Sequence, residues 1–227
     1  METSREASDK SDRIYLGIGR VQAKGGQRVV VEYSKTQTSI LDVAQELSQT
    51  RGFNGFSYRD IADRIGIRTA SIHHHFRTKH DLGTAMTHRY RSDFMAAVAA
   101  LETDASDPFE RLRSYAMLFM ATLEAGRMCL CGTLAVEYET LPQSMQTEVR
   151  AFFVDNERWI EGVLKAAQEH GQLAVSDTPR ELAATFLSTL EGTMMSIRAL
   201  GEARRFVVVV DQLLERLKLP ADTTQSH

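Results

Sequence analysis

The sequence lacks several features that would assign a function class at once. It has only two cysteines among 227 residues, Cys129 and Cys131, and no apolar run near the roughly 20 residues of a membrane-spanning helix. The opening "METSREASDKSD" has no apolar core of a secretory signal, and the chain contains no Walker loop, dinucleotide-binding fingerprint or internal repeat. We therefore expect a soluble cytoplasmic protein that is not an enzyme and needs no metal, cofactor or membrane.

The chain also lacks an overall basic excess, since its formal net charge is -3. This average hides a division along the chain. Residues 35–91 hold nine Lys and Arg against five Asp and Glu (9 - 5 = +4), whereas residues 92–227 hold 12 against 20 (12 - 20 = -8). A small basic segment followed by a larger acidic one predicts two regions with different tasks.

Helical periodicity dominates after Ser34, and the sequence predicts an all-α fold. The first helix is expected to stop at Gly52, and "FVVVV" at Phe206–Val210 falls within a helical period despite its β-branched residues. The other expected helices cover Tyr58–Arg64, the stretch "RTASIHHHF", Asp81–Ala100, Pro108–Ala125, Leu130–Thr140, Gln146–Gly171, Thr178–Leu200 and Glu202–Leu219.

Four regions follow from this pattern. Residues 1–34 are expected to be a flexible extension, with a hairpin around Gly25 and Gly26 as the alternative. Residues 35–82 should form a small three-helix domain, residues 83–219 a larger helical domain, and residues 220–227 a tail.

The small domain carries the most specific local signals. Ser57 stands where a helix N-cap belongs, and Asp60 three residues later completes a capping box. Gly66 interrupts that helix, and "RTASIHHHF" begins another after a short turn. Two short helices joined by a glycine-containing turn predict a helix-turn-helix unit.

The run from Ile40 to Leu82 resembles the DNA-binding domain of the TetR family of bacterial transcriptional regulators. The matching pieces are "ILDVAQELSQTRGFNGFSYRDIA" and "IGIRTASIHHHFRTKHDL", whereas the rest resembles the family only in helical layout and length. The resemblance implies a three-helix helix-turn-helix domain followed by a helical domain for effector binding and dimerisation. It further implies a homodimer whose partners are double-stranded operator DNA and a small-molecule effector.

Helical geometry gives the same interpretation of the second short helix. At about 100° per residue, Ile72 and Phe76 point toward a core, while Ala70 and His74 lie nearly opposite. Adjacent histidines diverge, so His73, His74 and His75 cannot close on one metal ion. Such a helix can enter the major groove with its amino end first.

The expected DNA contacts combine base edges and phosphates. Lys79 matches the family's phosphate-contacting lysine, whereas His73 stands where the family usually has tyrosine. The full expected set is Ser57, Tyr58, Arg59, Arg68, Thr69, Ala70, Ser71, His73, His74 and Lys79.

The stretch "RMCLCGTLAVEYETLP" resembles a segment of some TetR-type regulators, including electrophile-responsive ones. A thiol of lowered pKa would react with electrophiles or oxidants, whereas a cysteine that only packs would be a small buried apolar residue. We favour packing and keep the thiol sensor open. The candidate residues for effector or thiol sensing are Cys129, Cys131, Glu137, Met117 and Trp159.

The last two helices carry more apolar surface than a thin domain needs, which predicts a four-helix dimer interface. The residues expected there are Leu187, Leu190, Met194, Ile197, Val209 and Leu213. The favoured function is a repressor released from a palindromic operator by an effector. A helical thiol enzyme, and a nucleic-acid structural protein without a ligand, are the alternatives.

Overall fold

The computed structural model describes residues 32–101 and 107–218. In this part of the chain the helices are joined by turns and loops, and the β-structure is one isolated bridge between Leu173 and Lys218. Residues 1–31 of the expected flexible extension, including the alternative hairpin around Gly25, and the tail at 220–227 lie outside the described residues. The helices are α2 (Lys35–Arg51), α3 (Tyr58–Ile65), α4 (Thr69–His75), α5 (Lys79–Ala100), α6 (Pro108–Glu124), α7 (Leu130–Val136), the 3-10 helix η1 (Tyr138–Thr140), α8 (Gln143–Glu169), α9 (Pro179–Leu200) and α10 (Arg204–Leu217). The all-α prediction is confirmed.

Two differences from the expected helix boundaries are larger than the shifts of one or two residues seen at other ends. The expected helix over Leu130–Thr140 is divided, because α7 ends at Val136 and η1 begins at Tyr138. Helix α8 begins directly after Pro142, which serves as its N-cap in an extended conformation and lengthens the expected helix at its start. The apolar run Phe206–Val210 is helical within α10, as predicted.

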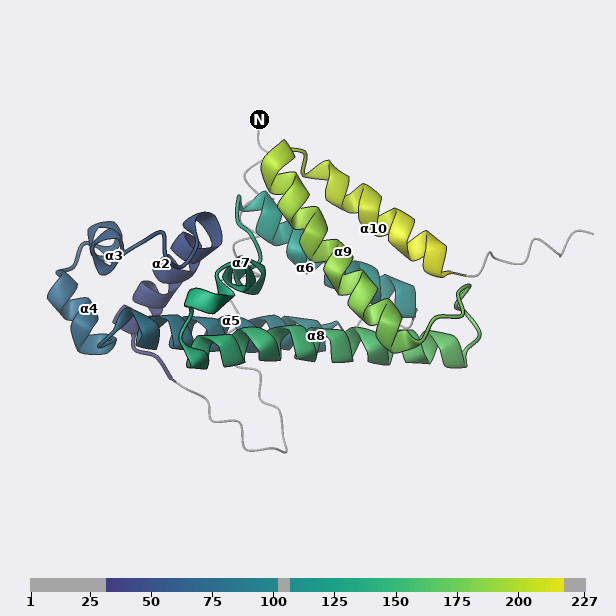
Figure 1. Cartoon of the computed structure of the whole chain (residues 1–227), viewed down its shortest axis with the longest axis horizontal. Helices are drawn as coiled ribbons and strands as arrows, with labels where there is room; N and C mark the ends of the chain where they lie inside the picture. The colour runs from purple at the N-terminus through teal and green to yellow at the C-terminus, as the bar shows by residue number, and fades with distance from the viewer. Residues whose placement is uncertain (1–31, 102–106, 219–227) are drawn as a thin grey trace, which may run out of the picture.

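Figure 1 shows how the helices are arranged. Helices α2, α3 and α4 gather at one end, and α5 leads from them along α8 into the larger bundle. Helices α9 and α10 pack on that bundle, with α9 against α8 and α10 against α6. The short α7 lies between α2 and α8, so it contacts both the small and the large unit.

The expected boundary between residues 82 and 83 falls inside α5, which continues from one unit into the other. Leu82 and Met86 near its start are buried against the small unit, and Phe94 and Val98 are buried in the bundle. Helix α5 therefore contributes buried side chains to both units, within one continuous hydrophobic core.

Aromatic side chains fill the centre of the bundle. The Phe94 ring lies 5.2 Å from that of Phe152 and 5.4 Å from that of Phe119. Tyr115 is fully buried, and its hydroxyl donates to Asn156 Oδ1 over 2.7 Å.

Among the described residues, no helix is both long and apolar enough to cross a membrane.

Candidate nucleic-acid interface

The turn between α3 and α4 depends on Gly66. This residue ends α3 in the left-handed conformation with φ of 71°, and its N–H donates to the Ala62 carbonyl over 3.0 Å. The N–H of Ile67 reaches the same carbonyl over 3.1 Å. Glycine adopts this conformation without the steric cost that a Cβ brings. The two helices and their turn form the predicted helix-turn-helix unit.

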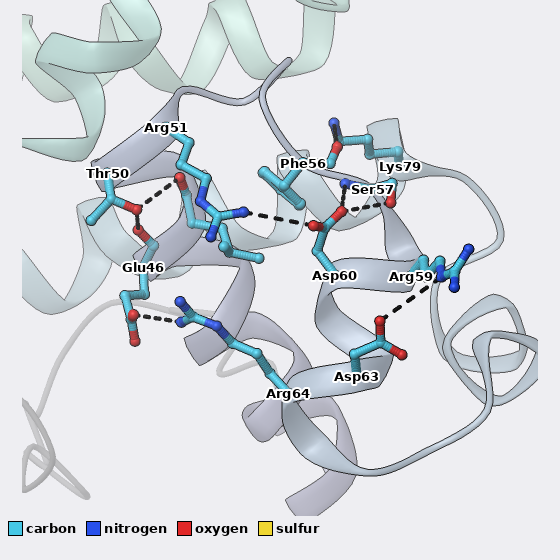
Figure 2. Close-up of polar contacts among 11 residues, drawn as sticks. Glu46, Thr50, Arg51, Phe56, Ser57, Arg59, Asp60, Asp63, Arg64 and Lys79 are labelled. Carbon is cyan, nitrogen blue, oxygen red and sulfur yellow. Dashed lines mark hydrogen bonds and ion pairs between the residues drawn. The ribbon is translucent and has the colours of Figure 1, made fainter.

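The start of α3 is fixed by the expected capping pair. The Ser57 N–H and hydroxyl both donate to Asp60 Oδ2, over 2.8 and 2.6 Å. These hydrogen bonds from Ser57 hold the pKa of Asp60 below its ordinary value. Figure 2 shows two further links to α2, in which Arg51 lies 3.6 Å from Asp60 and Arg64 lies 2.5 Å from Glu46. The helix is therefore oriented by its own cap and by α2.

Helix α4 divides into a buried and an exposed face, as its periodicity predicted. Ile72 is 0% exposed and Phe76 is 5% exposed, so both anchor the helix in the core. Thr69 and His75 are half-buried at the margin. The residues that remain exposed are Arg68, Ala70, Ser71, His73 and His74.

The three adjacent histidines have separate environments. His73 Nδ1 lies 3.2 Å from the Arg77 carbonyl, and its ring packs 4.7 Å from that of Tyr58. The His74 and His75 rings lie 5.4 Å apart in an edge arrangement. Within residues 32–101 and 107–218, no three potential ligands are grouped so that they could hold a metal ion.

Tyr58 requires a correction to its expected role as a DNA contact. Its side chain is buried, at 7% exposure, and its hydroxyl donates to the Phe76 carbonyl over 2.9 Å. Burial raises the pKa of the phenol, so the hydroxyl stays protonated and keeps this bond. The side chain therefore ties the start of α3 to the end of α4 and does not face solvent.

Lys79 also has an internal role that the sequence did not predict. Its ammonium donates to the carbonyls of Phe53 and Phe56 and lies 4.6 and 4.2 Å from the centroids of their rings. Desolvation lowers the pKa of this half-buried lysine. An ammonium has three donors, so at most one is left for a phosphate. The side chain chiefly fixes the α2–α3 turn.

Other basic side chains around the unit are exposed. Arg59 is 87% exposed along its side chain and makes only a long ion pair of 3.9 Å with Asp63 (Figure 2). Two exposed basic residues, Arg77 and His80, were absent from the expected set although they flank Lys79. The basic residues of the run "FRTKH" directly after α4 could have indicated them from the sequence.

Glu137, expected near an effector, instead joins the second domain to the small unit. Its carboxylate accepts hydrogen bonds from the Phe53 N–H over 2.6 Å and the Asn54 N–H over 3.3 Å. The Asn54 side chain also donates to Thr140 Oγ1 over 2.8 Å. The turn that Lys79 holds from one side is thus held from the other by the segment after α7.

Two other polar contacts link the second domain to α2. Arg198 near the end of α9 donates to the carbonyls of Thr50 and Gly126, each over 3.1 Å. Gln49 Nε2 donates to the Met128 carbonyl over 2.8 Å, and the Met128 N–H returns a bond to Gln49 over 3.3 Å. The carboxyl end of α2 is therefore bonded to α9 and to the segment before α7.

The two cysteines are free and buried, at 1% exposure for Cys129 and 0% for Cys131. Burial raises the pKa of both thiols well above the ordinary value, and the nearby Glu191 raises it further. A thiolate is the reactive form, so these thiols are not activated in this arrangement. The packing interpretation agrees with this environment.

The remaining effector candidates lie at the edge of the core. Trp159 is half-buried and stacks on Tyr115 at 5.2 Å between centroids, and Met117 packs against the core from a half-buried position. Neither lines the two surface depressions found along α9 and at the α9–α10 turn. Their expected contact with an effector stays a prediction.

The residues expected at a dimer interface need correction. Leu187, Leu190, Met194 and Ile197 are at most 5% exposed, because they pack into the chain's own core. Val209 and Leu213 are half-buried. The outer surface of these two helices instead presents Thr185, Ser188, Gly192, Met195, Ser196, Ala199, Leu200 and Val208.

Comparison with known proteins accounts for both units. A family model described as bacterial regulatory proteins, tetR family, matches residues 40–86, and one described as the tetracyclin repressor-like C-terminal domain matches residues 108–213. A TetR-family regulator structure from Agrobacterium tumefaciens is 38% identical with a TM-score of 0.78, covering 81% of this chain and 97% of that one. The chain belongs to the TetR family. It is accordingly a DNA-binding transcriptional regulator, in a family for which dimerisation and effector control are typical.

Other regulators are similar at lower identity. A TetR regulator structure from Legionella pneumophila is 30% identical with a TM-score of 0.74, and the match covers 83% of this chain and 100% of that one. The transcriptional repressor DhaR of Mycobacterium sp. strain GP1 is 27% identical over 65% of this chain and 75% of its own length. The regulator AcuR of Cereibacter sphaeroides is 25% identical over 76% of this chain and 80% of its own length.

Proposed function

We propose that this TetR-family chain is a homodimeric repressor that inserts α4 into the major groove of a palindromic operator. The observation that carries the proposal is the division of α4, which buries Ile72 and Phe76 and leaves Ser71, His73 and His74 exposed on the other side. Hydroxyl and imidazole groups make hydrogen bonds with base edges, and the small Ala70 side chain permits close approach.

Phosphate contacts are assigned to the exposed polar groups around α4. Arg59 lies in the first turn of α3 and Arg68 directly before α4, whereas Arg77 and His80 follow α4, so exposed donors lie on both sides of α4. The Ser57 hydroxyl must exchange its bond with Asp60 before it can donate to a phosphate. We assign Lys79 mainly to holding the α2–α3 turn, and Thr69 to a supporting contact at the start of α4.

The homodimer is assigned to the outer surfaces of α9 and α10. The exposed positions on α9 are mostly small, which allows helices of two subunits to approach closely, and Met195, Leu200 and Val208 are 51, 54 and 60% exposed. A dimer would place two copies of α4 in successive major grooves about 34–36 Å apart, or a multiple of that spacing.

Effector control is assigned to the contacts that join the two units. Glu137 holds the α2–α3 turn, and Arg198 and Gln49 hold the carboxyl end of α2. An effector that moves α7 or α9 within the bundle would therefore change the position of the helix-turn-helix unit. Release follows because the two recognition helices must keep the spacing of the operator half-sites.

The test is binding of the purified chain to DNA from upstream of its own gene, in the presence of competitor DNA. We expect saturable binding whose logarithmic affinity falls with the logarithm of salt concentration. The double variant Ser71→Ala and His74→Ala should reduce specific binding, whereas Glu157→Gln on the exposed surface of α8 should not. Absence of salt-dependent, competitor-resistant binding by the wild-type protein would refute the proposal.

A further inference from the structure

Glu191 in α9 is a half-buried residue whose carboxyl group the DNA-binding function does not use. Its Oε1 atom has almost no contact with solvent and no hydrogen-bond partner among the described residues. The Cys129 thiol is hydrogen-bonded to the carboxyl group, and burial raises the pKa of Glu191 to about 7. Buried polar atoms without partners are uncommon in native proteins because they lose hydration without compensation.

The neighbouring helix leaves space for this carboxyl group. A Cβ atom added to Gly132, in the first turn of α7, would overlap Glu191 Oε2. The glycine thus lets the carboxyl group lie against the backbone of α7, while Cys129 occupies the N-cap position of the same helix. Glu191 therefore contacts the beginning of α7, and Glu137 is the C-cap residue at the other end of the same helix.

The charges around Glu191 favour a positive partner. Burial raises the pKa of Glu191, the hydrogen bond from Cys129 lowers it only in part, and no basic side chain contributes to the shift. Arg91 lies near enough to affect Cys131 but is already bonded to Glu148 over 2.9 Å and to Asp155 over 2.7 Å. An anion placed beside Glu191 would be repelled, whereas a cation would supply the missing counter-charge.

Aromatic side chains lie beside the carboxyl group. Glu191 raises the pKa of Tyr115, which shows that the two groups are close. The Tyr115 ring lies 5.5 Å from Phe119 and 5.2 Å from Trp159. The faces of aromatic rings attract cations, and a carboxylate among such rings suits an alkylammonium group.

We propose that Glu191 anchors the effector and selects a molecule that carries a positively charged ammonium group on an apolar body. This assignment rests on the proposed effector control of DNA binding. The ammonium group would pair with the carboxylate, and the apolar body would displace side chains of the adaptable aromatic and methionine core. Binding at Glu191 would press on Gly132 and the start of α7, which connects the site to the α2–α3 turn.

The experiment uses calorimetric titration of the full chain with three probes of similar size. They are benzyltrimethylammonium, whose charge does not titrate, neutral 3-phenylpropan-1-ol and anionic phenylacetate. The variants are Glu191→Gln, which preserves the shape of the side chain, and Glu157→Gln as an exposed control in the same domain. We expect the cation to bind the wild type most tightly and to bind Glu191→Gln about 10- to 150-fold more weakly.

The pH dependence on the wild type provides a second test that needs no variant. The cation requires the ionised carboxylate, so its affinity should fall about tenfold for each pH unit below the Glu191 pKa of about 7. The proposal is overturned if the cation does not bind the wild type, if another probe binds better, or if Glu191→Gln binds it equally well. Operator binding is measured separately, without the probes. A failure of the repressor assignment can therefore be distinguished from a failure of the effector proposal.

Discussion

Replacing Glu137 with alanine removes the carboxylate that holds the α2–α3 turn. The bond from the Phe53 N–H is short, at 2.6 Å, and partly buried, whereas the 3.3 Å bond from the Asn54 N–H is exposed. A hydrogen bond to a charged group contributes about 1.5–3 kcal/mol, and the exposed bond adds only a few tenths. The variant should therefore lose about 2–3 kcal/mol of unfolding free energy, which lowers Tm by about 4–12 °C in a protein of this size.

Hydrogen exchange gives a local measurement of the same contact. The Phe53 amide should exchange about 10- to 150-fold faster in Glu137→Ala, because its hydrogen bond is lost. Glu139→Ala is the matched control, since Glu139 is exposed and lies two residues away. Equal Tm values and equal Phe53 exchange rates in the two variants would refute the assignment of Glu137 as the link to the turn.

Three further predictions concern other positions. Gly52→Ala should lower the free energy of unfolding in urea more than Gly66→Ala does. Both glycines have a positive φ, of 82 and 71°, that strains an alanine, but only at Gly52 would the added Cβ also come within 2.6 Å of Glu137 Oε1. His73→Ala should weaken operator affinity with little change in Tm, whereas half-buried His75→Ala should do the reverse, and equal effects in both assays would contradict this. Folding raises the Glu191 pKa from 4.5 to about 7, so wild-type stability should fall by roughly 3 kcal/mol between about pH 4.5 and pH 7, and Glu191→Gln should lack this loss.

The helix-turn-helix unit was predictable because its signals are local. The Ser57 and Asp60 pair and the break at Gly66 act within a few residues of the backbone that they shape. The roles of Tyr58 and Lys79 were not predictable in this way. Tyr58 bonds to a carbonyl 18 residues away and Lys79 to one 26 residues away, and such partners are known only after the helices pack.

The choice of residues for the dimer interface needed correction for a related reason. Apolar periodicity identified the inward face of α9, including Leu190 and Met194, but the chain's own bundle already covers that face. An interface between such helices uses the opposite side, where small residues such as Ser188 and Gly192 give a weak apolar pattern. Burial of the two cysteines was equally inaccessible to the sequence, because spacing does not reveal thiol exposure.

The position of α7 connects the two proposals physically. Its first turn lies against the Glu191 carboxyl group through Gly132, and its C-cap residue Glu137 bonds to the turn that precedes α3. Helix α7 has only 7 residues, Leu130–Val136, so the two contacts are separated by about two helical turns. An effector bound at Glu191 would therefore act on the α2–α3 turn directly, without requiring a rearrangement of the whole bundle.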